Sequence, residues 1–151
     1  MARAFLGLGA NLGDPAAGIE EALTRLDARP DIAVVVRSRL IVTKPWGKTD
    51  QPDFTNGVAA IETGLAPSAL LDACLSIERA MGRVRAERWG PRLIDIDIVA
   101  YGHLVLRTER LTLPHPHAHR RDFVLRPLRE IAPEMADWVV DQANAAKAGI
   151  A

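Results

Sequence analysis

The sequence predicts an α+β domain in which an antiparallel sheet carries two helices on one face. Two observations support this prediction. Strand-like and helix-like segments follow one another in the order β-α-β-β-α-β, the split βαβ pattern of the ferredoxin-like sandwich. The chain has 151 residues, 48% hydrophobic and 25% charged, which suits one globular domain. We expect a single domain over residues 1–151, with its core at about 3–134, a C-terminal extension, and a weakly ordered tail at 143–151.

The first part of the chain is typical of a strand, a helix and a second strand. Residues 3–10 form an apolar run, as expected of a buried strand. Asp14 is a good N-cap and Pro15 suits the first helical position, so a helix is expected over about 15–28. Residues 31–43 are rich in β-branched side chains, which predicts one continuous strand.

The middle of the chain completes the pattern. Residues 44–53 combine prolines, a glycine and charges and are expected to form a loop before a strand at 54–63. Pro67 opens a second helix, and Gly82 is placed to end it. The alternating segment 93–101 is expected to form the last strand of the sheet.

The C-terminal part is expected to be irregular. A turn is predicted at Gly102, and residues 113–134 hold several prolines and histidines. We therefore expect this stretch to lie across the sheet or along its edge without regular structure.

Composition excludes several function classes. Basic and acidic residues balance at 19 each, which argues against binding to nucleic acid or to an anionic membrane through overall charge. The single Cys74 excludes an internal disulfide framework and a cysteine-based zinc site. The N-terminus lacks the long apolar core of a signal peptide, so a cytoplasmic protein is expected.

The strand at 93–101 has two chemically different faces. Its isoleucines at 94, 96 and 98 alternate with Asp95 and Asp97, so the two carboxylates share the other face. Two rises along a strand place their Cα atoms about 7 Å apart. Like charges at this spacing raise each other's pKa unless a cation lies between them, and Mg²⁺ prefers carboxylate oxygens. The pair therefore suggests a magnesium site.

Positive charge gathers immediately before this strand. Only Glu87 is acidic between positions 79 and 92, a window that holds five arginines: Arg79, Arg83, Arg85, Arg88 and Arg92. Guanidinium groups match phosphate oxygens, so the arginines and the carboxylate pair together have the ingredients of a polyphosphate site.

Motifs from about residue 4 to 134 resemble, in order, those of the 6-hydroxymethyl-7,8-dihydropterin pyrophosphokinase family. The most specific is RWGPRLIDIDI at 88–98. The others are LGANLG at 8–13, QPDFTN at 51–56, and, in the C-terminal part, LPH at 113–115, RDFVL at 121–125 and EIAP at 130–133.

The resemblance implies a ferredoxin-like fold and transfer of pyrophosphate from ATP to the pterin hydroxymethyl group, with release of AMP, in folate biosynthesis. It implies that Asp95 and Asp97 hold two Mg²⁺ ions and that Arg83 and Arg92 act in the transition state. The implied ATP contacts are Arg85, Trp89, Ile98, Arg110, Leu111, Thr112, His115 and Arg121. The implied pterin contacts are Thr43, Pro45, Trp46, Phe54, Asn56 and Phe123. ATP and the pterin are the expected partners, and no obligate protein partner is inferred.

Two other functions remain open from the residues alone. A metal hydrolase or nucleotidyltransferase could use Asp95 and Asp97 with His115 and His117 as imidazole ligands. An RNA-binding module could use the arginine-rich segment on an open sheet, although the two carboxylates would repel phosphate in the absence of metal. A dinucleotide-binding fold is rejected, because the glycine spacing at 7–13 is wrong and no second parallel βαβ half is evident.

Overall fold

The computed structural model describes residues 1–45, 49–82 and 93–149. Their elements are, in chain order, β1 (Ala2–Ala10), α1 (Pro15–Asp27), β2 (Ile32–Arg37), β3 (Ile41–Thr43), β4 (Phe54–Thr63), α2 (Pro67–Ala80), β5 (Asp95–Tyr101), β6 (Leu106–Arg107), β7 (Thr112–Leu113), the short 3-10 helix η1 (Ala118–Arg120), α3 (Asp122–Ile131) and α4 (Pro133–Lys147).

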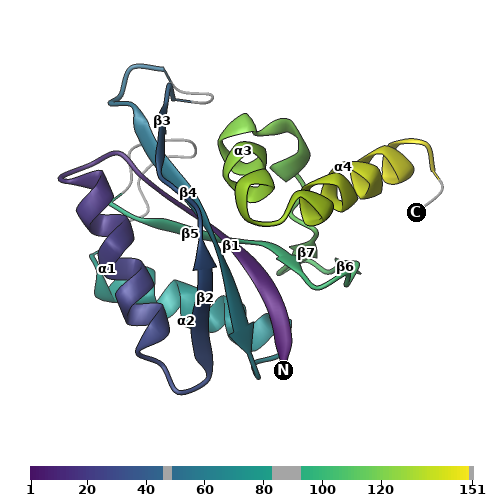
Figure 1. Cartoon of the computed structure of the whole chain (residues 1–151), viewed down its shortest axis with the longest axis horizontal. Helices are drawn as coiled ribbons and strands as arrows, with labels where there is room; N and C mark the ends of the chain where they lie inside the picture. The colour runs from purple at the N-terminus through teal and green to yellow at the C-terminus, as the bar shows by residue number, and fades with distance from the viewer. Residues whose placement is uncertain (46–48, 83–92, 150–151) are drawn as a thin grey trace.

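The main sheet has the strand order of a ferredoxin-like sandwich. Within the described residues it contains five strands in the order β2-β4-β1-β5, with β3 also paired to β4, and every pairing is antiparallel. Helices α1 and α2 cover one face, and α3 and α4 lie on the opposite side (Figure 1). The predicted α+β class is therefore confirmed, and the C-terminal extension supplies a second helical layer.

The face toward α1 and α2 is apolar throughout. Ile94, Ile96 and Ile98 are at most 3% exposed and pack with side chains of β1, α1 and α2. Asp95 and Asp97 are only half-buried on the other side of the strand. The alternation expected for this segment is confirmed, although β5 begins at Asp95 rather than at residue 93.

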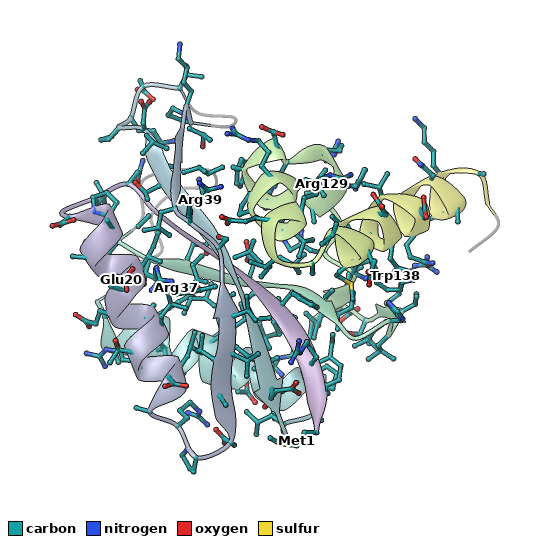
Figure 2. All side chains as sticks on the ribbon, in the orientation of Figure 1. Met1, Glu20, Arg37, Arg39, Arg129 and Trp138 are labelled. Atoms are coloured by element: carbon teal, nitrogen blue, oxygen red, sulfur yellow. The ribbon has the colours of Figure 1, made fainter. Side chains whose placement is uncertain are left out.

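The first helices follow their sequence signals. Asp14 caps α1 by accepting a hydrogen bond from the Ala17 amide at 3.2 Å, and Pro15 occupies the first turn. On the exposed side of α1, Glu20 accepts hydrogen bonds from the Arg37 guanidinium of β2, and the two residues lie next to each other in Figure 2. After α2, Gly82 has φ +87°, the left-handed conformation expected of a glycine that ends a helix.

The prediction of one strand over 31–43 is wrong, because the structure has β2 and β3 separated at residues 38–40. The Ser38 hydroxyl accepts a hydrogen bond from the Val58 amide of β4 at 2.9 Å, so a side-chain oxygen takes the place that a backbone carbonyl of a continuous strand would have. The Leu40 side chain fills the space over Gly57, where a Cβ would lie 2.7 Å from Leu40 Cδ2. These tertiary contacts end β2 at Arg37, and β3 begins as a separate strand at Ile41.

The prediction of irregular structure over 113–134 is also wrong, because this stretch contains η1, α3 and the start of α4. Pro127 lies inside α3, where its missing N–H weakens the helix. Burial compensates for this loss, since Val124, Pro127 and Leu128 pack on the face of the sheet opposite α1 and α2. Helix α4 continues to Lys147 and so includes part of the stretch where a tail was expected.

Two further contacts fix the C-terminal layer. The Arg39 amide and Nε, just after β2, donate to the Glu130 carboxylate near the end of α3 at 2.7 and 2.6 Å. The His103 and Trp138 rings lie 4.9 Å apart between their centroids, which joins the turn after β5 to α4. Among the described helices, none is long and apolar enough to cross a membrane.

The burial of the core predicts how side-chain truncations change the free energy of unfolding. Leu6 on β1 is fully buried, so Leu6→Ala should lower the free energy of unfolding by about 2–5 kcal/mol. The matched change Leu104→Ala, at a side chain that is 39% exposed, should change it by no more than about 0.5 kcal/mol. Urea denaturation of the two variants checks this, and equal losses would contradict the assignment of the core.

Candidate active site

Three strands place an amide and a carboxylate in one row across the sheet. Gly9 of β1 pairs with Asp95 of β5 on one side and with Asn56 of β4 on the other. Residues paired across strands share a face, so Asp95 and Asn56 lie on the same side of the sheet, about 10 Å apart at two strand spacings. This is the face opposite α1 and α2.

Glycines leave the floor of this row open. A Cβ at Gly9 would lie 2.5 Å from Asn56 Oδ1, so any other residue there would displace the amide. Gly7 occupies the corresponding position beside Asp97, its partner in the β1–β5 register. The two glycines therefore keep the strand between the amide and the carboxylates free of side chains.

The amide end of the row contains most of the expected pterin contacts. Asn56 is 7% exposed and donates from Nδ2 to Thr43 Oγ1 of β3 at 3.3 Å. Phe54 pairs with Thr43 in the β3–β4 register and is partly exposed, and Pro45 follows two residues after β3.

The loop before β4 is attached to the end of β1. Asn11, which is 3% exposed, donates from Nδ2 to Gln51 Oε1 and to the Pro52 carbonyl, each at 2.9 Å. Two motifs that lie 40 residues apart in the sequence thus meet at this edge of the site.

The carboxylate end contains Asp97, His115 and Arg121. His115 Nε2 and Arg121 Nη1 each lie 3.9 Å from Asp97 Oδ2. The position of His115 follows from an irregularity in β5. The register with β1 shifts so that Val99 has no partner there, and the Val99 carbonyl accepts the His115 amide at 2.9 Å. A bulge of this kind redirects side chains and occurs often beside active sites.

His115 is held neutral. Burial, together with the positive charge of Arg121 and the neighbouring His117, lowers the pKa of His115 to about 4. Its Nδ1 accepts the His117 amide at 3.1 Å, so the proton of the neutral ring belongs on Nε2, the atom nearer Asp97. The imidazole can therefore donate a hydrogen bond into the site without adding charge.

Arg121 connects the carboxylate end to an aromatic side chain. It is 9% exposed, and its guanidinium carbon lies 5.6 Å from the centroid of the Phe123 ring on α3. Since α3 packs on β4 and also contacts β3, Phe123 enters the site from the helical layer that faces the Asn56 row. The expected Phe54 and Phe123 thus come from different layers.

The remaining expected ATP contacts that the structure describes gather toward α2. Ile98 is buried in the α1–α2 face, and Leu111 packs against the same cluster. Arg110 donates to the Ser68 carbonyl at 3.1 Å and to Asp72, both on α2. Thr112 begins β7, next to Leu111. These residues lie at the edge of β5 rather than in the Asn56–Asp95 row.

Five expected site residues lie outside the described residues. They are Trp46, Arg83, Arg85, Trp89 and Arg92.

Sequence reasoning missed Glu78 and the role of the two glycines. Glu78 of α2 is 2% exposed, and its Oε2 accepts the Ile96 amide at 2.6 Å, between the two aspartates. This bond fixes the start of β5 and hence the spacing of Asp95 and Asp97. A glutamate on the apolar side of α2, one residue after Ile77, was the available signal. Gly7 and Gly9 were considered only as a possible dinucleotide motif.

Comparison with known proteins identifies the family. A sequence model of the 7,8-dihydro-6-hydroxymethylpterin-pyrophosphokinase (HPPK) family matches residues 5–133, which include every described site residue. The chain belongs to the HPPK family. It is 55% identical over 135 residues to 2-amino-4-hydroxy-6-hydroxymethyldihydropteridine pyrophosphokinase of Methylorubrum extorquens, covering 89% of this chain and 85% of that protein. The enzyme of the same name from Pseudomonas aeruginosa is 46% identical over 133 residues, covering 88% and 82%.

Solved HPPK-DHPS structures share the fold. A Plasmodium falciparum HPPK-DHPS structure with pteroate superimposes with a TM-score of 0.72 at 15% identity, and an HPPK-DHPS complex with substrates does so with 0.69 at 14%. They cover 97% and 88% of this chain, whereas the chain spans only 43% and 40% of theirs. The likeness covers less than half of each of those longer chains and concerns the fold.

HPPK membership defines the reaction. The enzyme transfers pyrophosphate from ATP to 6-hydroxymethyl-7,8-dihydropterin in folate biosynthesis. This decides against the hydrolase and RNA-binding alternatives.

The neutral His115 predicts a pH dependence of stability. Its pKa is about 6.5 when unfolded and about 4 when folded, so protons bind preferentially to the unfolded chain. The stabilising contribution is complete above pH 6.5 and is lost as the pH falls toward 4, by an amount on the order of 3 kcal/mol. His115→Asn retains an acceptor near Nδ1 but does not titrate. Its unfolding free energy should fall less steeply than that of the parent over this range, whereas parallel curves would contradict the assigned burial.

Proposed function

We propose that Asp95 and Asp97 hold the Mg²⁺ ions on which pyrophosphate transfer depends, two ions as the family resemblance implies. The observation that supports this most strongly is the cross-sheet row, with half-buried carboxylates at one end and a buried amide at the other. The donor chemistry fits, because magnesium takes carboxylate oxygens and leaves positions for substrate phosphates. The described residues contain no cluster of three or more His, Cys, Asp or Glu side chains suited to one ion, so the ligands beyond the carboxylates are left to substrate and water.

ATP is proposed to bind along β5. Arg110, Leu111, Thr112 and Ile98 form the end suited to adenine, close to α2. The triphosphate would extend from there toward Asp97, where His115 and Arg121 both approach the carboxylate. Arg85 and Trp89 remain proposed ATP contacts from the sequence.

The pterin is proposed to bind at the other end of the row. Asn56 presents a buried amide oxygen and nitrogen for the edge of the heterocycle, and Phe54 and Phe123 are partly exposed rings suited to its faces. Thr43 fixes the rotamer of Asn56. Pro45 and Trp46 complete the proposed pocket.

Positioning and charge do most of the chemical work in this proposal. Magnesium, when bound, neutralises phosphate charge and brings the triphosphate and the pterin hydroxyl together. The hydroxyl oxygen attacks the β-phosphorus and gives up its proton to water, while the bond from the β-phosphorus to the oxygen that bridges to the α-phosphorus breaks and AMP leaves with that oxygen. Neutral His115 donates from Nε2, and Arg121 contributes a fixed positive charge. Arg83 and Arg92 are proposed to stabilise the additional charge of the transition state.

A cytoplasmic location is proposed as well, since the reaction consumes ATP. We also propose that the domain acts without an obligate protein partner.

The carboxylate assignment is tested by Asp97→Asn. Magnesium-dependent uptake of a non-hydrolysable ATP analogue, measured by calorimetry, should be abolished, and turnover should fall by at least about a thousandfold. The melting temperature should be unchanged or higher, because one of two like charges is removed. Asp137→Asn, at an exposed acid of α4 that pairs with Arg129 of α3, is the control and should behave as the parent. Normal magnesium-dependent uptake by Asp97→Asn would refute the site.

The pterin end is tested by Gly9→Ala. The added Cβ meets Asn56 Oδ1 at 2.5 Å, and the amide must move because it is buried against Thr43. We expect at least about a tenfold loss of pterin affinity by fluorescence titration, with magnesium-dependent nucleotide binding retained.

The matched control is Gly64→Ala. A Cβ at Gly64 has no atom within 4 Å among the described residues, so this variant should bind pterin as the parent does. Equal pterin affinity in both variants would show that Asn56 does not bind the edge of the heterocycle.

A further inference from the structure

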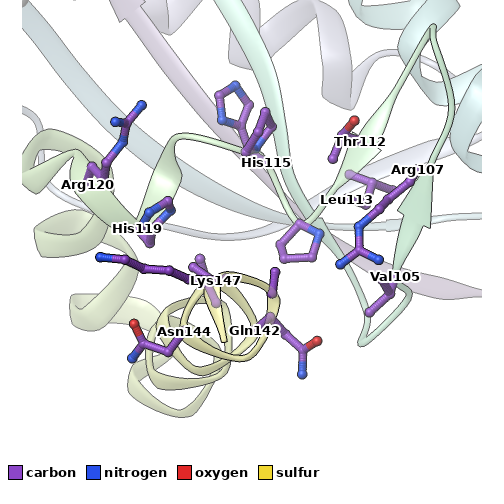
Figure 3. Close-up of a pocket in the computed structure, with 15 residues that line it drawn as sticks. Val105, Arg107, Thr112, Leu113, His115, His119, Arg120, Gln142, Asn144 and Lys147 are labelled. Atoms are coloured by element: carbon purple, nitrogen blue, oxygen red, sulfur yellow. The ribbon is translucent and has the colours of Figure 1, made fainter. Parts of the chain in front are cut away.

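A cavity of about 580 Å³ lies outside the row of catalytic residues, between α4 and the segment that connects β6 to η1 (Figure 3). Its volume is within the range usual for small-molecule sites. Three separate parts of the chain form its wall. Arg107 comes from β6, His119 and Arg120 from η1, and Lys147 from the end of α4.

The wall of this cavity is basic and contains no acid. In addition to His115, four of its fifteen lining residues are Arg, Lys or His, and none is Asp or Glu. The pKa of His119 is lowered by burial and by the positive charges of Arg120 and Lys147. Figure 3 shows the Lys147 side chain extending toward His119.

Two of these cations are not neutralised by the protein. Most other arginines in the described part of the chain have a carboxylate within ion-pair distance, such as Arg25 with Glu21 and Arg126 with Asp122. Within the same described residues, no ion pair joins Arg107 or Lys147 to an acid. Unneutralised cations around a concave surface favour an anionic ligand.

The rest of the wall suits an organic body with polar substituents. Leu113 and Val139 are buried side chains, and Pro114 adds a flat apolar surface. Gln142 and Asn144 of α4 also line the cavity and carry amide donors and acceptors. The combination of an apolar floor, two amides and several cations is typical of sites for charged metabolites.

We propose that this cavity is a second binding site, for a small organic molecule that carries a phosphate group or paired carboxylates. Lys147 binds an anionic group on the η1 side of the cavity, Arg107 binds a second anionic or polar substituent on the β6 side, and the apolar floor accommodates the body between them. The cavity shares His115 and Thr112 with the proposed ATP site, and its other lining residues are not among the expected substrate contacts. An occupant would therefore lie behind two of the expected ATP contacts.

The experiment follows the His119 ring by NMR, without magnesium or nucleotide, while inorganic phosphate or citrate is added. The two probes distinguish a phosphate from a carboxylate ligand. We expect a saturable shift of the His119 signals and a rise of the pKa of His119, because a bound anion offsets the charges that lower it. In the double variant Arg107→Ala/Lys147→Ala, affinity for the preferred probe should fall by at least about tenfold.

The matched control is Arg25→Ala/Arg126→Ala, which removes the same charge from exposed ion pairs elsewhere and should bind the probe as the parent does. An equal loss of probe affinity in the two double variants would mean that only the overall charge of the protein matters, and this would overturn the proposal. A His119 signal that does not saturate with either probe would also overturn it. So would displacement of the probe by a saturating magnesium–ATP analogue, which would make the cavity an extension of the ATP site. Because the phosphate and citrate titrations contain no pterin, magnesium or nucleotide, their failure leaves the proposed function intact.

Discussion

The site depends on one constraint, which is the absence of side chains at two successive positions, Gly7 and Gly9, on one face of the central strand. Gly7 and Gly9 lie on β1 between the strands that hold Asn56 and the two aspartates. A sheet normally fills such a face with side chains about 5 Å from their cross-strand neighbours. Here the gap lets a buried amide and two carboxylates face the same space from either side of an open floor. The opposite face of β1 carries Leu6 and Leu8 in the core, so the strand both supports the fold and shapes the site.

Local patterns were sufficient for the elements that locate the carboxylates. The alternation of isoleucine and aspartate in β5 is a property of the strand itself, and one apolar face was enough to assign the other. The cap at Asp14 and the left-handed Gly82 are likewise set within a few residues of sequence. The grouping of Asn56 with Thr43, and of Asp97 with His115 and Arg121, came from the family resemblance and not from any local pattern.

Features that depend on distant contacts could not be predicted. The break between β2 and β3 arises from Ser38 bonding to Val58 and from Leu40 lying over Gly57, and neither contact has a local signature. Helix α3 forms despite Pro127 because the sheet offers it an apolar surface. Glu78 is the clearest case. A buried carboxylate on a core-facing helix is unfavourable unless it finds a donor, and its donor is a β5 amide 18 residues away in the sequence.

The two faces of the sheet therefore serve opposing demands. The face toward α1 and α2 is closed and apolar, and it stabilises the fold. The other face holds Asp95 and Asp97, whose Cα atoms lie about 7 Å apart, with an uncharged imidazole and the Arg121 guanidinium beside Asp97, and like charges at this spacing repel each other. Such an arrangement costs stability in the free protein. In the proposed function, Mg²⁺ held by the two carboxylates would replace this repulsion with attraction. This repulsion is tolerated because Glu78 and the buried isoleucines hold β5 from the face toward α1 and α2.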